Sequence, residues 1–213
     1  MNTDLITYYR KRAKEYEKIY DKPERQADLV EATTFLQDCF AGKSVLEIAC
    51  GTGYWTERIA ATATSVLATD VNATVIDVAK NKTFPRHNVA FEVADLYQFQ
   101  PAEKYDAVFG GFIWSHILLE DLDEFIRTVN NLVKPGGQVV FMDNRYVSGS
   151  STPITSTDVN GNTFQTRKLE NGDTWQVLKN FPSVDFLKNT LRSQSIRVAV
   201  KTLEYYWIAV GGK

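Results

Sequence analysis

The 213-residue chain has the length of one ordinary domain, and its 44% hydrophobic and 23% charged residues are typical of a globular protein. Its formal net charge of -2 argues against a nucleic-acid-binding protein, which normally carries a basic excess. No apolar run approaches the roughly 20 residues that cross a bilayer, and no apolar leader opens the chain. Two cysteines, Cys39 and Cys50, make no disulfide framework, so we expect a cytoplasmic protein.

The N-terminal forty residues are predicted to be mostly helical, from position 4 to position 40. Leu29, Phe35 and Leu36 recur on one helical face, and Pro23 marks a break before them. Gly42 is then placed to end the helix.

Short apolar strands and amphipathic helices alternate through the middle of the chain. This alternation predicts a parallel, doubly wound sheet whose strands are buried on both faces. The expected strands span 44–49, 65–68, 88–93, 105–109 and 138–142, and the expected helices span 54–61, 75–80 and 122–133.

The last third departs from this rhythm. A loop is expected over 147–162, and Glu170-Asn171-Gly172 between two strand-like runs, 163–169 and 173–178, indicates a hairpin. A helix is expected over 184–191. The final runs, 196–202 and 205–210, have too short a connection for a parallel crossover, so they should pair antiparallel.

The loop Glu47-Ile48-Ala49-Cys50-Gly51-Thr52-Gly53 carries the main functional signal. It follows the first strand of the sheet, and its two glycines allow a tight turn and a close approach by a ligand. A dinucleotide fingerprint would need a third glycine, where this chain has Thr56. Glu47 suits a cationic or amine-bearing ligand better than a pyrophosphate, and Asp70 ends the next strand where a ribose would be held. A nicotinamide enzyme remains the alternative.

Five segments, in this order, resemble the motifs of the class I S-adenosylmethionine-dependent methyltransferases. Residues 45–53 resemble the first motif, Asp70 the ribose-binding acid, Ala94-Asp95-Leu96 the adenine segment, 105–109 the fourth strand and 132–137 the L-x-P-G-G turn. The resemblance implies a three-layer, doubly wound, Rossmann-like α/β fold. Its seven strands would follow the order 3-2-1-4-5-7-6 with strand 7 antiparallel, in agreement with the expected C-terminal pair. The implied cofactor is S-adenosylmethionine, with S-adenosylhomocysteine as product.

The resemblance also implies one methyltransferase domain over 1–213, with a helical lid at 1–40 and a substrate-side insertion at about 147–181. Tyr9 and Tyr16, in the lid, either contact the cofactor or only pack the helix. The full set of expected cofactor-binding residues is Tyr9, Tyr16, Glu47, Ala49, Gly51, Gly53, Asp70, Val71, Asp95, Leu96, Gly111 and Phe112.

His116, after strand four, is the candidate catalytic base, because an unperturbed histidine titrates near neutral pH. The alternative is a histidine that only orders its loop. The expected substrate-binding residues are Trp114, Arg145, Tyr146 and Trp175, and Phe164, Arg167 and Asn144 are further candidates.

The expected acceptor is a small molecule, methylated on oxygen or nitrogen. Strand four lacks both the Asn/Asp-Pro-Pro-aromatic element of base-amine methyltransferases and the Pro-Cys of cytosine-C5 enzymes. We therefore expect no nucleic acid, no membrane and no metal, and a monomer or homodimer. A protein or RNA acceptor, or a non-catalytic cofactor-binding protein of the same fold, stays open.

Overall fold

The computed structural model describes residues 3–195 and 197–213. Met1 and Asn2 of the predicted lid, and Ile196 at the start of a predicted strand, lie outside the described residues. Within those two ranges, no helix has the length and apolar character needed to cross a membrane.

A seven-stranded sheet forms the middle layer of the protein. Its strands lie in the spatial order β3 (Val89–Val93), β2 (Ser65–Asp70), β1 (Ser44–Ile48), β4 (Tyr105–Gly111), β5 (Val133–Asn144), β10 (Tyr206–Gly212) and β9 (Arg197–Thr202). β10 runs antiparallel to both of its neighbours, whereas β3, β2, β1, β4 and β5 pair in parallel. The predicted strand order and the antiparallel strand are both confirmed.

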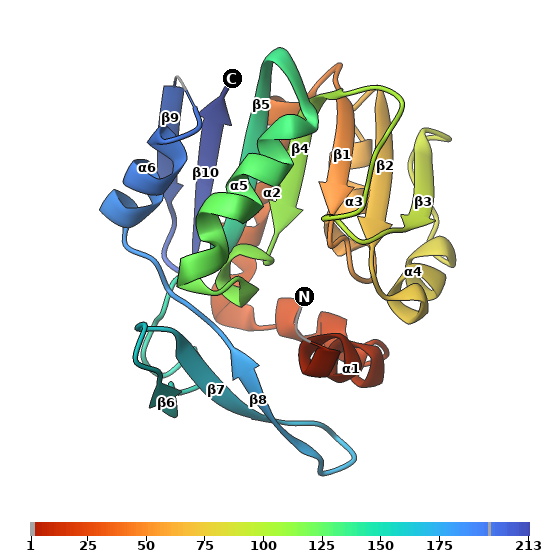
Figure 1. The fold of residues 1–213 in the computed structure, drawn as a ribbon. Coiled ribbons are helices and arrows are strands. Elements are labelled where there is room, and N and C mark those ends of the chain that lie inside the picture. The colour runs from red at the N-terminus through yellow and green to blue at the C-terminus, as the bar shows by residue number, and fades with distance from the viewer. Residues whose placement is uncertain (1–2, 196) are drawn as a thin grey trace.

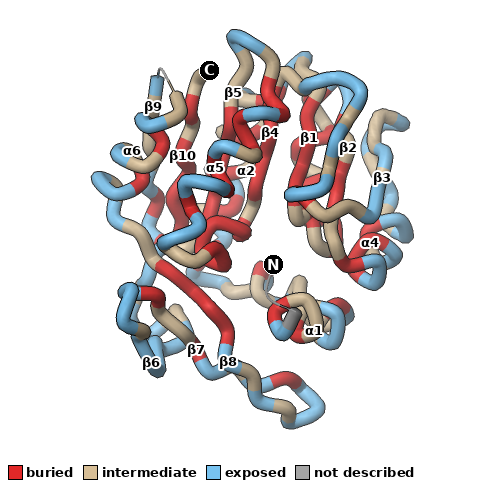
Figure 2. The backbone as a smooth tube through the Cα atoms, viewed as in Figure 1, coloured by how far each residue is buried: buried red, intermediate tan, exposed pale blue. Residues whose placement is uncertain are grey.

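Helices cover both faces of this sheet (Figure 1). One face packs against α2 (Gln26–Phe40), α3 (Tyr54–Ala60) and α4 (Ala73–Lys80), and the other against α5 (Leu122–Asn131) and α6 (Val184–Arg192). The apolar side chains of the sheet and helices therefore form two clusters, one on each face of the sheet. The central strands are buried along most of their length, whereas the edge strand β3 is largely exposed or half-buried (Figure 2).

Local sequence explains where these helices form. In α5 the predicted apolar stripe, Leu122, Phe125, Ile126 and Val129, is fully buried. The side chain of Asn72 caps α4 by accepting the Thr74 N–H at 3.1 Å, and Ser183 caps α6 in the same way.

Three details differ from the sequence prediction. β5 begins at Val133, because Val133 pairs with Tyr105 before a register shift, so the predicted Pro135-Gly136-Gly137 turn is an irregularity inside a longer strand. The N-terminal region is broken into α1 (Thr3–Arg12), two 3-10 helices, η1 (Tyr16–Tyr20) and η2 (Pro23–Arg25), and α2. The predicted 147–162 loop contains a short strand, β6 (Ser156–Thr157).

β6 extends the predicted hairpin, β7 (Thr163–Lys168) and β8 (Thr174–Leu178), into a small three-stranded sheet. α1 packs on this sheet through a separate apolar cluster of Leu5, Tyr8, Leu169 and Val177. Figure 1 shows α1 facing the carboxyl ends of β1, β2 and β4. Two segments far apart in the sequence therefore meet beside the edge where an open α/β sheet binds ligands.

Candidate active site

A cavity opens at the carboxyl ends of β1, β2 and β4, where the strand order reverses between β1 and β4. The space between its walls is about 910 Å³, open solvent at its mouth included. Its roof comes from α1 and η1 through Leu5, Ile6, Tyr9 and Tyr16. The other lining residues are Ile48, Ala49, Gly51, Thr52, Thr69, Asp70, Val71, Asn72, Val75, Ala94, Leu96, Gly111, Phe112, Ile113 and His116.

Backbone strain is concentrated at this cavity. Among the described non-glycine residues, only Ala49 and Phe112 have positive φ angles, of 51° and 61°, and they follow the adjacent strands β1 and β4. Left-handed conformations of such residues persist where the surrounding structure fixes them, commonly at functional sites. Here the Phe112 N–H is held by the Met142 carbonyl at 2.7 Å. This hydrogen bond therefore fixes Phe112 against the cavity.

Asp70 lies at the end of β2 with its carboxylate held in place. One oxygen accepts the Gly51 N–H at 3.0 Å and the other accepts the Asn72 N–H at 2.9 Å. Burial raises the pKa of this carboxyl above its ordinary value, and the two backbone donors oppose that shift. A carboxylate oriented in this way can accept hydrogen bonds from a ligand diol.

Glu17 of η1, which the sequence did not predict as a site residue, connects the roof of the cavity to the glycine loop. Its carboxylate accepts a hydrogen bond from the Thr52 hydroxyl at 2.6 Å and pairs with Lys82 beyond α4. Asn72 adds a bond from its amide to the Ile6 carbonyl. The N-terminal segment is therefore fastened across the cavity by side chains that the linear sequence does not bring together.

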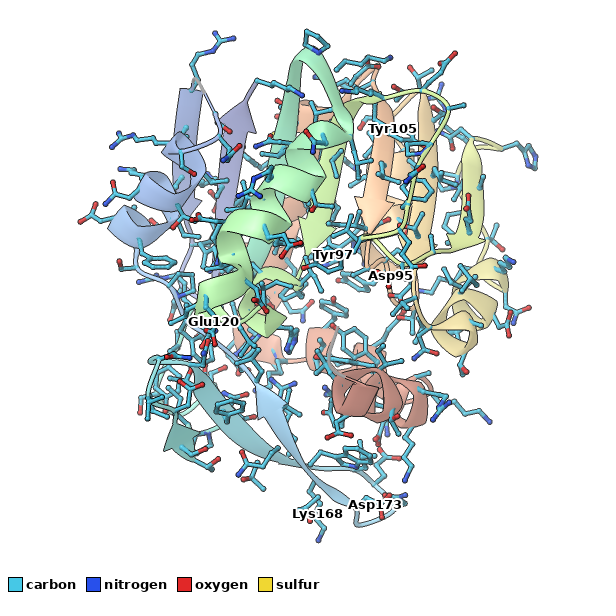
Figure 3. All side chains as sticks on the ribbon, viewed as in Figure 1. Asp95, Tyr97, Tyr105, Glu120, Lys168 and Asp173 are labelled. Atoms are coloured by element: carbon cyan, nitrogen blue, oxygen red, sulfur yellow. The ribbon has the colours of Figure 1, made fainter. Side chains whose placement is uncertain are left out.

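A second cavity, of about 1000 Å³ with open solvent included, adjoins the first. The two share Tyr9, Tyr16, Phe112 and His116 in their linings, so these residues stand at the junction. Six cationic residues, and no Asp or Glu of the described chain, line the second cavity: Arg12, Lys22, Arg25, Arg167, Lys168 and Lys179. Figure 3 shows Lys168 near the tip of the β7–β8 hairpin, close to Asp173.

His116 is locked in one tautomer at the junction. Its Nδ1 donates to the Leu178 carbonyl at 2.6 Å, so its Nε2 accepts the Tyr9 hydroxyl at 2.8 Å. Burial, together with the charges of Lys179 and Arg167, lowers the pKa of His116 well below its usual value. The imidazole is therefore neutral at physiological pH and bonded at both nitrogens.

Lys179, just after β8, is a buried cation paired with the buried carboxylate of Asp143. Its ammonium donates to Asp143 at 2.7 Å and to the Ser115 hydroxyl at 2.6 Å. An ammonium has three N–H donors, so one is left without a protein partner in a side chain that lines the second cavity. Burial lowers the pKa of Lys179 to about 8, although Asp143 opposes the shift.

The four sequence-predicted substrate residues lie outside the linings of both cavities. Trp114 is 1% exposed and packs in the core against Phe125, Phe141 and Trp207. Arg145 donates to the Leu203 carbonyl, Tyr146 is half-exposed against Phe181, and Trp175 packs on Tyr8 and Lys11. None of these four predicted residues lines either cavity.

The further candidates Arg167 and Asn144 do line the second cavity. Its lining also includes Arg12, Arg25 and Lys179, which the sequence did not predict as site residues.

Comparison with known proteins agrees with this geometry. A model of the methyltransferase-domain family matches residues 45–137. Two solved structures, the DhpI-SAH complex and the DhpI-SAM-HEP complex, superpose with TM-scores of 0.79 and 0.80 at 29% and 26% identity. Each alignment covers 99% of this chain, with 97% of the first structure and 98% of the second.

Together, these matches support a class I S-adenosylmethionine-dependent methyltransferase. Among its relatives is malonyl-[acyl-carrier protein] O-methyltransferase 2 of Ilyobacter polytropus, which is 31% identical over 50% of this chain and 41% of that protein. The ubiquinone biosynthesis O-methyltransferase of Coxiella burnetii is 29% identical over 47% of this chain and 43% of that protein. The match therefore spans less than half the length of each of these two relatives.

S-adenosylmethionine is the cofactor of this methyltransferase, and the first cavity has the features needed to hold it. Asp70 is oriented for a ribose diol, and Val71 and Leu96 offer apolar contacts suited to an adenine ring. A Cβ added at Gly51, which lines the cavity, would meet no protein atom within 4 Å beyond its chain neighbours. Nine of the twelve predicted cofactor residues line the cavity: Tyr9, Tyr16, Ala49, Gly51, Asp70, Val71, Leu96, Gly111 and Phe112.

The other three predicted residues lie just outside the lining. Glu47 is 2% exposed beneath the loop, where it accepts the Thr56 hydroxyl at 2.6 Å, and burial raises its pKa to about 8. Gly53 is the N-cap of α3. The Asp95 carboxylate accepts the Tyr97 N–H, and Figure 3 places these two residues together after β3. The structure thus places Glu47 as a support for the loop, whereas direct cofactor contact by these three residues stays a prediction.

Replacing Gly51 by alanine should weaken cofactor binding more than it destabilises the protein. Gly51 has a φ of 56°, so alanine costs about 1 kcal/mol of backbone strain, and its methyl group would occupy open space at a residue that lines the cavity. Gly42→Ala is a matched control, because Gly42 has a φ of 72°, equally open surroundings and no place in the cavity lining. We expect similar losses of thermal stability but a roughly tenfold higher Kd for S-adenosylhomocysteine in Gly51→Ala alone. Equal Kd values by calorimetry would contradict this placement of Gly51.

In the described residues, no group of three or more His, Cys, Asp or Glu side chains is placed to hold a metal ion.

Proposed function

We propose that this methyltransferase transfers a methyl group from S-adenosylmethionine to an oxygen of a small molecule that carries an ionised acidic group. The cationic second cavity carries the proposal. Arg25 is 7% exposed, and neither it nor Arg167 has a carboxylate within ion-pair distance in the described chain. Buried cations are ordinarily paired, so unneutralised arginines facing a cavity favour an anionic ligand.

The position of the second cavity favours it as the acceptor site. It meets the cofactor cavity at Phe112 and His116, so a molecule bound there lies next to the cofactor site. The N-terminal segment, from Tyr8 to Arg25, lines it and helps to shield it from solvent. A concave site lined by side chains of the N-terminal segment and of the small sheet favours a small acceptor over a protein or an RNA. The names of the relatives, which include two O-methyltransferases, support oxygen as the acceptor atom.

Lys179 and Arg167 are the residues placed to hold the acceptor anion. Lys179 has one N–H free of protein partners, and Arg167 uses its Nε and Nη2 on Gln165 but keeps other donors. Bound S-adenosylmethionine supplies a methyl group on a positively charged sulfur, so transfer forms one oxygen–carbon bond, breaks one sulfur–carbon bond and leaves S-adenosylhomocysteine. The chain's own contribution is to orient the acceptor oxygen and exclude water.

An acidic oxygen that is already ionised needs no base, which defines the role we propose for His116. Its Nε2 is occupied by the Tyr9 hydroxyl, and neighbouring cations disfavour its protonated form. In this proposal His116 is a positioning residue that holds Tyr9, and thereby α1, over the junction. The lid at 1–40, the insertion at 147–181, a cytoplasmic location and a monomeric or dimeric state stay predictions.

An acceptor panel tests the proposed function. Formation of S-adenosylhomocysteine is measured with S-adenosylmethionine and matched pairs of compounds, each carboxylic or phosphonic acid beside its neutral amide or ester. We expect turnover with acids at kcat/KM at least about tenfold above their neutral partners, because only the acids pair with the cationic cavity. Preferential turnover of neutral alcohols or amines would overturn the proposal.

The same assay separates the two roles of His116. With the best acid of the panel, His116→Asn should lower kcat/KM without removing an acidic limb from the pH profile, because no proton leaves the acceptor through this imidazole. Loss of such a limb would instead assign His116 as the base.

A further inference from the structure

The second cavity, hereafter the acceptor cavity, holds more positive charge on buried and half-buried side chains than one oxyanion needs. Lys179 and Arg167 come from the small sheet and the segment after it, whereas Lys22 and Arg25 come from the N-terminal segment at η2. We infer that the acceptor carries two acidic groups, one held by Lys179 and Arg167 and the second by Lys22 and Arg25. This inference rests on the proposed function and defines the class of acceptor.

The side chains of Lys22 and Arg25 are held in place by hydrogen bonds to the protein. The Arg25 guanidinium donates to Asn144 at 3.0 Å and to the Ser150 hydroxyl at 3.0 and 3.1 Å, and it stacks over Tyr205 and Tyr206. Lys22 donates to the Ser150 carbonyl at 2.6 Å. Both cations are thus held in place while keeping N–H donors for a ligand.

No described carboxylate neutralises this pair within the cavity. Glu24 accepts the Ser150 hydroxyl, to which Arg25 also donates, but makes no ion pair with Arg25 or Lys22, and Asp28 accepts the Tyr205 N–H. Neither acid lines the cavity. The pKa of Lys22 is lowered by burial and by the charge of Arg25, which agrees with two like charges held close together.

The two cation pairs are anchored to consecutive residues at the end of β5. Lys179 donates to Asp143, Asp143 accepts the Asn144 amide at 3.2 Å, and Asn144 accepts Arg25. Three hydrogen bonds and one side-chain amide thus join the two cations, which puts Lys179 Nζ and Arg25 Nη1 at most about 11 Å apart. A molecule with two acidic groups separated by two to four carbon atoms can reach both pairs.

Matched ligands test this inference with the full chain saturated with S-adenosylhomocysteine. Calorimetry compares propionate with succinate, butyrate with glutarate, and ethylphosphonate with 3-phosphonopropionate, each pair differing by one carboxylate. At least one diacid should bind about tenfold or more tightly than its monoacid, because a second charge-assisted contact is added.

Lys22→Met keeps the aliphatic stem and removes the charge, so it should abolish most of the diacid advantage while changing monoacid binding less than about twofold. Lys18→Met is the matched control, because Lys18 pairs with exposed Glu170 and does not line the acceptor cavity. Arg25→Lys adds a second variant that keeps the charge of this buried position.

Two results would overturn the inference: diacids that bind no better than monoacids, or a Lys22→Met variant that weakens both alike. If monoacids bind and accept methyl groups in these cases, the proposed function stands without the second acidic group. If no acid of either kind binds or is methylated, the proposed function fails as well.

Discussion

Replacing Lys179 by methionine is expected to lower kcat/KM for the best acidic acceptor by about 100- to 1000-fold. Truncating one partner of a buried, hydrogen-bonded charge pair costs about 2–5 kcal/mol, and each 1.4 kcal/mol corresponds to about tenfold. Lys179 is 4% exposed and faces the acceptor cavity next to its junction with the cofactor cavity. Steady-state kinetics with saturating S-adenosylmethionine measures the loss.

The same substitution leaves Asp143 buried without its cation, which should destabilise the protein by about 3–5 kcal/mol. The double variant Lys179→Met/Asp143→Asn controls for this effect, because it removes both charges. We expect it to recover much of the thermal stability but none of the activity. If the double variant regains wild-type kcat/KM, Lys179 acts only through folding and does not hold the acceptor.

Lys179 also predicts the alkaline side of the pH profile. Its pKa, lowered to about 8, means that the ammonium loses its proton as the pH rises through this value. The anionic acceptor then loses a charged partner, so kcat/KM should fall above about pH 8, a profile that reports the free enzyme. Lys179→Arg should flatten this limb, because a guanidinium stays protonated throughout the range. A limb unchanged in Lys179→Arg would assign it to another group.

Replacing Asp70 by asparagine is expected to raise the Kd of both S-adenosylmethionine and S-adenosylhomocysteine by about 10- to 100-fold. A hydrogen bond to a charged group contributes about 1.5–3 kcal/mol, and the amide cannot accept from a ligand diol as a carboxylate does. The Asp70 carboxylate also accepts the Gly51 and Asn72 N–H groups, so the substitution loosens the loop that lines the cavity. Calorimetry with each ligand measures the effect.

Asp77→Asn is the control for Asp70→Asn, because Asp77 is exposed on α4 and does not line the cavity. Thermal unfolding without ligand separates weakened binding from a destabilised fold. Equal affinities of the Asp70 variant and the wild-type chain for both ligands would remove Asp70 from the cofactor site.

The fold was largely predictable because the sequence patterns that specify it are local. Alternating apolar strands and amphipathic helices define a doubly wound sheet, and the short link between the last two strands requires an antiparallel pair. The details that failed depend on pairing between distant residues. Val133 joins β5 because Tyr105 lies beside it, and β6 exists because Phe164 is there to pair with Ser156.

The cofactor half of the site was equally accessible, because its residues follow consecutive parallel strands whose carboxyl ends share one edge of the sheet. Ala49 and Gly51 follow β1, Asp70 ends β2, and Phe112 follows β4. For these residues, the position after a strand was enough to place them at the cavity. Gly53 and Asp95 also follow strands but lie outside its lining, and Glu47 precedes the end of β1 with its side chain buried beneath the loop.

The sequence by itself thus determined the sheet, the glycine loop and the identity of the cofactor, since each depends on residues close together in the chain. Only the tertiary structure revealed the cationic second cavity, because Arg12, Arg25, Arg167 and Lys179 come from four separate segments. It also places Trp114, a predicted cavity wall, in the core, where Phe141 and Trp207 pack against it. Unneutralised charge is a property of assembled segments, so the cationic character of this cavity became visible only after folding.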